Sequence, residues 1–93
     1  MAESGFKGKS MKAVAFDVAE GYISVNPLFL KKFDKGMIKE LFENLSKALT
    51  ITRNEKVTIG DQAALRTRNM KLQRLHNAII ILRNIAREKR IPL

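Results

Sequence analysis

Apolar residues recur at spacings of three and four between residues 37 and 49, namely Met37, Ile38, Leu41, Phe42, Leu45, Ala48 and Leu49. Side chains spaced in this way fall on one face of an α-helix. Glu40, Glu43 and Lys47 fall on the opposite face, and Glu43 precedes Lys47 in the favourable i,i+4 order. The pattern predicts an amphipathic helix over 37–49 with a solvated outer face.

A second helical pattern runs from Gln62 to about Lys89 without a Gly or Pro, and Pro92 follows it. Gly60 and Asp61, just before it, provide a chain break and a helix cap. One stripe of this segment is apolar and has the spacing of a short heptad seam: Leu65, Leu72, Leu75, Ile79, Leu82 and Ala86. We predict one long amphipathic C-terminal helix.

The centre of this long helix is apolar on nearly all sides. Ile80 and Ile81 point away from the seam, so the helix has to be buried on more than one face. The helix at 37–49 and an N-terminal hairpin could cover the extra face within one chain, but we favour a second copy and therefore a homodimer. The predicted interface residues are Leu72, Leu75, Ile79, Ile80 and Leu82.

The N-terminal third has the pattern of a short β-hairpin. From Lys12 the residues KAVAFDV alternate, residues 19–21 offer a turn, and residues 22–25 form a second β-prone run. Asn26 and Pro27 then favour a short helix that ends near Phe33. Residues 50–59 could form a second small hairpin or an extended connection, and both alternatives stay open.

Together these patterns predict an α+β, α-dominant fold with a short N-terminal β-hairpin, two shorter helices and one long C-terminal amphipathic helix. A chain of 93 residues is long enough for one hydrophobic core. The first ten residues combine Gly, Ser and Lys without periodicity. We therefore expect a mobile tail over 1–11 and a single basic domain over 12–93.

The chain has no cysteine, which excludes disulfides, thiolate catalysis and cysteine-based metal sites and favours a cytoplasmic protein. Its longest uninterrupted apolar run is residues 78–82. A membrane-spanning helix needs roughly 18 apolar residues, so we expect no membrane association.

The residues that carry catalysis in other proteins form no recognisable site. His76 is the only histidine, so no typical zinc site can be completed, and the acidic residues form no spaced pair suited to acid–base work. Gly8, Lys9 and Ser10 have the form of the end of a phosphate-binding loop, but Glu3 stands where that loop needs a glycine. We expect a non-enzymatic protein without a cofactor or a metal.

Positive charge is concentrated at the C-terminal end. The chain has 18 basic and 9 acidic residues, and residues 60–93 alone carry a net charge of +6 and six of the seven arginines. Such a field favours polyanions, and arginine suits phosphate. The residues predicted to bind nucleic acid are Arg66, Lys71, Arg74, Arg83 and Arg87.

We therefore predict a small basic accessory protein that is associated with nucleic acid or ribonucleoprotein and binds the phosphate backbone through its C-terminal helix. The basic side chains of this helix do not share one face, which weakens the case for a single stripe along a groove. The alternative is an adaptor, or a subunit of a larger assembly, that docks on an acidic protein partner.

Overall fold

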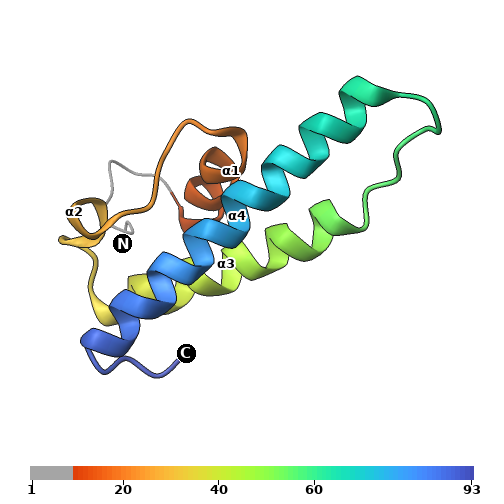
Figure 1. Cartoon of the computed structure of the whole chain (residues 1–93). Helices are drawn as coiled ribbons and strands as arrows, with labels where there is room; N and C mark the ends of the chain where they lie inside the picture. Colours follow the sequence, from red (N-terminus) through yellow and green to blue (C-terminus); the bar gives the residue numbers. More distant parts are fainter. Residues whose placement is uncertain (1–9) are drawn as a thin grey trace.

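The computed structural model describes residues 10–93, and these residues form four helices and no strand (Figure 1). The helices are α1 (Met11–Glu20), α2 (Pro27–Leu30), α3 (Lys35–Arg53) and α4 (Gln62–Glu88). Helix accounts for 71% of the structure. The fold of residues 10–93 is all-helical, and the α+β class predicted from the sequence is wrong.

Helices α3 and α4 form an antiparallel hairpin joined by residues 54–61, and α1 packs against both of them (Figure 1). The short helix α2 lies on the connection between α1 and α3. The 27 residues of α4 rise about 40 Å, which is close to the longest extent of the molecule, 44 Å. Helix α4 therefore sets the length of the protein.

The predicted N-terminal β-hairpin over residues 12–25 is absent, because its first half is helix α1. The alternation of Val14, Phe16 and Val18 is compatible with a strand, but the buried side chains follow helical spacing: Met11, Val14, Ala15, Val18 and Ala19. A helix buries all five against α3 and α4 and leaves Phe16 in solvent. Ser10 caps this helix, since its Oγ accepts a hydrogen bond from the Ala13 N–H at 3.1 Å.

Helix α1 ends at Gly21, whose φ of +87° is the left-handed conformation that glycine adopts without strain. The Gly21 and Tyr22 N–H groups donate to the carbonyls of Val18 and Asp17, at 3.1 and 2.9 Å. The second run of the predicted hairpin, residues 22–25, is a bend followed by a segment without regular secondary structure, and it pairs with no strand in the described part of the chain. Burial of Val25 holds this segment against the core.

The remaining predicted helices are present. Asn26 caps α2 and Asp61 caps α4, each through a side-chain oxygen that accepts a backbone N–H. Helix α3 is longer than the predicted 37–49, because Asp34 caps it at one end and it continues to Arg53 at the other. It takes in residues 50–53, so the open alternative at 50–59 resolves to the end of a helix followed by a connection, without a hairpin.

The range predicted to be a tail, 1–11, is divided by the structure. Ser10 caps α1 and Met11 is fully buried, so both belong to the fold. The remainder of the predicted tail, residues 1–9, lies outside the described residues.

The hydrophobic core lies where α1 packs on the α3–α4 hairpin. Helix α4 contributes Leu75, Ala78, Ile79, Leu82, Ile85 and Ala86 to it. Beyond the core, residues 50–74 form a projecting segment that we call the arm: the end of α3, the connection and the first half of α4 (Figure 1). Thr52 is the only buried residue of the arm. No helix within 10–93 is both long enough and apolar enough to cross a membrane.

Candidate functional site

The face of α4 that points away from the core is polar and basic. With 100° between successive residues, its buried side chains occupy one arc, and the opposite arc is exposed along the whole helix. We call this arc the outer face. Its members are Gln62, Leu65, Arg66, Asn69, Gln73, His76, Asn77, Ile80, Arg83, Asn84 and Arg87.

The outer face carries positive charge without any negative charge. Between Asp61 and Glu88, α4 contains no acidic residue. Its arginines therefore have no i,i+3 or i,i+4 carboxylate neighbour on the helix to neutralise them. Five side-chain amides and His76 lie among them, so the face offers many hydrogen-bond donors over about 37 Å.

Three of the five arginine and lysine side chains predicted to bind nucleic acid lie on the outer face. Arg66 is exposed on the arm, and within residues 10–93 its side chain makes no hydrogen bond or ion pair. The Arg83 guanidinium lies 5.5 Å from the centre of the Phe42 ring, a cation–π contact that orients it while it stays exposed. Arg87 lines the same shallow hollow as Phe42 and Arg83.

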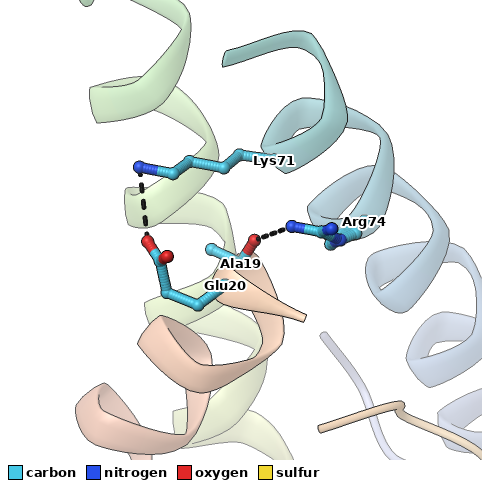
Figure 2. Close-up of polar contacts among 4 residues, drawn as sticks. All are labelled: Ala19, Glu20, Lys71 and Arg74. Carbon is cyan, nitrogen blue, oxygen red and sulfur yellow. Dashed lines mark hydrogen bonds and ion pairs between the residues drawn. The ribbon is translucent and has the colours of Figure 1, made fainter. Parts of the chain in front are cut away.

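The other two side chains, Lys71 and Arg74, point toward α1 (Figure 2). The Lys71 Nζ lies 3.3 Å from the Glu20 Oε2, and both side chains are only about a quarter exposed. Arg74 Nη1 donates to the Ala19 carbonyl at 3.0 Å. A helix leaves its last carbonyls unpaired and carries partial negative charge there, so Arg74 stabilises the end of α1.

The structure thus divides the predicted set into two groups with different surroundings. Arg66, Arg83 and Arg87 are exposed on one face, whereas Lys71 and Arg74 hold α1 against α4. Sequence reasoning missed the amide side chains of the outer face. The signal that could have located them is the acid-free run from Gln62 to Arg87, in which amides recur at helical spacing.

Arg68 lies apart from both groups. It lines a hollow formed with residues 57–62 at the end of the arm, and its Nε is buried without a hydrogen-bond partner in the described part of the chain. Because it faces the connection, it adds little to the charge of the outer face.

The predicted homodimer interface lies mostly inside one chain. Leu75, Ile79 and Leu82 are buried in the core of residues 10–93, and Leu72 is half-buried. Ile80 is the exception, at 44% exposed, and it lies in the middle of the outer face. Of the five residues, Ile80 alone is well exposed to a partner. Helix α1 supplies much of the cover that the sequence assigned to a second copy.

Comparison of the chain with protein-family models, with curated proteins and with solved structures found no significant match.

Proposed function

We propose that the protein binds nucleic acid through the outer face of α4, as a non-enzymatic accessory protein. The observation that carries the proposal is the exposed, acid-free face with Arg66, Arg83 and Arg87 along it. Arginine guanidinium groups match the geometry of phosphate oxygens, and a basic patch raises the local concentration of a polyanion. Binding of this kind is tolerant of sequence, because phosphates are the same at every base.

The spacing of the arginines favours contacts at two places along the ligand. Arg66 lies 17 residues from Arg83, about 26 Å along the helix axis. A straight helix touches a curved groove over a limited length, so its two ends meet phosphates on either side of that groove. Asn69, Gln73 and Asn77 lie between them, and such amides pair with base edges or sugar oxygens.

The test measures binding of the full chain to a mixed-sequence DNA duplex and a single-stranded RNA by fluorescence anisotropy at several salt concentrations. We expect affinity to fall steeply with salt for the parent protein. Replacing Arg66, Arg83 and Arg87 together by Ala should lower the slope of log K against log salt by about 3, because each phosphate contact contributes about 0.9.

The matched control replaces Lys31, Lys32 and Lys39 by Ala. These residues are exposed and do not belong to α4, and the control removes the same net charge. It should leave most of the binding intact. Equal losses in both triple variants would mean that overall charge is responsible, and absence of binding by the parent protein would contradict the proposal.

An acidic protein partner is the second candidate, and one observation favours it. Leu65 and Ile80 are 41% and 44% exposed on the outer face, and a protein surface would remove this apolar area from water. The discriminating measurement is co-purification after nuclease treatment. A defined acidic protein that stays bound, and is lost in the Ile80→Asp variant, would favour this candidate over nucleic acid.

A further inference from the structure

An apolar hollow of about 370 Å³ lies between α1 and α3, away from the outer face of α4. We call it the α1/α3 groove. Small side chains line it, Ala15, Ala19 and Ala48. Phe16 and Ile51 also line it, and they are 61% and 66% exposed. The same surface therefore presents both projecting apolar side chains and the room to receive them.

The charged side chains of the groove follow one pattern on both of its sides. On α1, Lys12 precedes Phe16 by four residues and Glu20 follows it by four. On the other side, Lys47 precedes Ile51 by four residues on α3, and Glu55 follows Ile51 by four residues, just after the helix ends. All six residues line the groove. Each side of the groove is thus Lys, apolar, Glu in order.

The end of α1 and the second half of α3 lie toward the same end of the groove. Arg83 lies over Phe42, so the end of α4 is beside the first half of α3, and Lys71 is beside the second half. The ion pair of Lys71 with Glu20 then places the end of α1 at the same level (Figure 2). One end of the groove is therefore basic and the other carries both glutamates.

The charges of α1 are placed against its helix dipole. Lys12 lies in the first turn and Glu20 in the last, whereas the opposite arrangement stabilises a helix. Lys12 and Lys47 form no ion pair within residues 10–93. Lys71 of the same chain offsets the charge of Glu20, but Lys12 and Lys47 have no carboxylate partner among the described residues, and pairing with an oppositely directed copy provides one.

We infer that the α1/α3 groove is the contact surface of a homodimer with a twofold axis across its centre. That axis sets α1 antiparallel to α1 of the partner and α3 antiparallel to α3. Phe16 and Ile51, midway along each side, then meet their own copies, while Lys12 faces Glu20 and Lys47 faces Glu55 of the second copy. A surface complementary to itself in shape and charge is what an isologous interface requires.

This inference does not rest on nucleic-acid binding. Lys71 is the only residue of α4 that lines the groove, so pairing through it leaves the outer face of α4 exposed on both copies. The two proposals can therefore fail separately.

The test is sedimentation equilibrium of the full chain over micromolar to millimolar concentrations. We expect a monomer–dimer equilibrium that Phe16→Asp weakens by at least about 100-fold, because it places two carboxylates at the twofold axis. Phe16 is exposed in the single chain, so this variant should keep the helical circular dichroism of the parent protein.

Charge reversal at Lys47 on α3 and at Glu55, just after that helix, tests the antiparallel arrangement. Lys47→Glu and Glu55→Lys should each raise the dissociation constant roughly tenfold, since each creates two like-charge contacts. The double variant should restore the parent value. The matched control is Lys39→Glu, because Lys39 is on α3 but outside the groove. This variant should change the dissociation constant little.

Two results would overturn the inference. One is a parent protein that stays monomeric at millimolar concentration. The other is a dimer that resists Phe16→Asp, which would place the association on another surface. Failure of the double variant to recover would contradict the pairing of Lys47 with Glu55 across the axis.

Discussion

The two halves of α4 belong to one continuous helix but have opposite surroundings. Residues 75–88 contain every buried side chain of the helix, whereas residues 62–74, on the arm, contain none. The second half carries the apolar run 78–82, and the first half carries four of the basic residues. The same backbone hydrogen bonds run through both, so the difference comes from side chains alone.

This comparison separates what folds the chain from what is free to bind. Most helical stability in proteins comes from packing of an apolar face, and only the second half of α4 has such packing on a large scale. The first half is held by its cap, by its helix propensity, by half-buried side chains and by the contacts of Lys71 and Arg74 with the end of α1. The arm is thus where a ligand can be contacted at the smallest cost to the fold.

The largest expected effect comes from shortening a core side chain in the second half. Leu82 is fully buried, so Leu82→Ala should lower the free energy of unfolding by about 2 to 5 kcal/mol. Leu65→Ala, the same substitution on the arm, should change it by less than about 0.5 kcal/mol. Urea unfolding followed by circular dichroism measures both. Similar losses at the two positions would show that the halves do not differ as described.

The helices themselves could largely be predicted from the sequence. Apolar residues spaced by three and four located α3 and α4. The beginnings of α2, α3 and α4 are marked by their caps, Asn26, Asp34 and Asp61, because capping depends on local chemistry. Helix α1 could not be predicted in the same way. Its apolar residues satisfy both a strand pattern and a helix pattern, and only packing against α3 and α4 decides between them.

The candidate site shows the same division. Sequence alone placed the positive charge on the last helix, because charge is additive along a chain. It could not separate Arg66 and Arg87 from Lys71 and Arg74, since the partners of the second pair belong to α1, more than 50 residues earlier. Long-range contacts of that kind depend on the fold, and the fold expected at residues 12–25 was wrong.

A middle-sized effect is expected where the two halves of α4 meet, at the contact between Arg74 and the end of α1. A Cβ on Gly21 would lie 3.0 Å from Arg74 Cζ, and Gly21 has a positive φ. Gly21→Ala combines backbone strain with displacement of the guanidinium, so it should cost about 1 to 3 kcal/mol in urea unfolding.

The matched control for that variant lies on the arm. Gly60 also has a positive φ, of +91°, but a Cβ there would meet nothing within 4 Å. Gly60→Ala therefore introduces backbone strain without crowding a neighbour, and it should lower the free energy of unfolding by about 1 kcal/mol. If both substitutions lower the free energy of unfolding by the same amount, the contact of Arg74 with the end of α1 contributes nothing to stability.

The smallest expected effect comes from removing a helix cap, either Asp34 beside the core or Asp61 on the arm. Asp34 caps α3 beside the core, and its Oδ1 accepts from the Met37 N–H at 2.8 Å. Asp61 caps α4 at the far end of the arm, and its Oδ1 accepts from the Ala64 N–H at 3.0 Å. Loss of either cap costs about 1 kcal/mol of helix stability.

That loss should appear in different measurements for the two caps. Asp34→Ala should lower the free energy of global unfolding by about 1 kcal/mol, since α3 begins within the cooperative core. Asp61→Ala should instead speed amide hydrogen exchange in the first turns of α4 and leave global unfolding nearly unchanged, because the arm can open while the core stays folded. Equal losses of global stability would mean that arm and core unfold as one unit. Arg66 would then be presented by a surface as rigid as the one that holds Arg83.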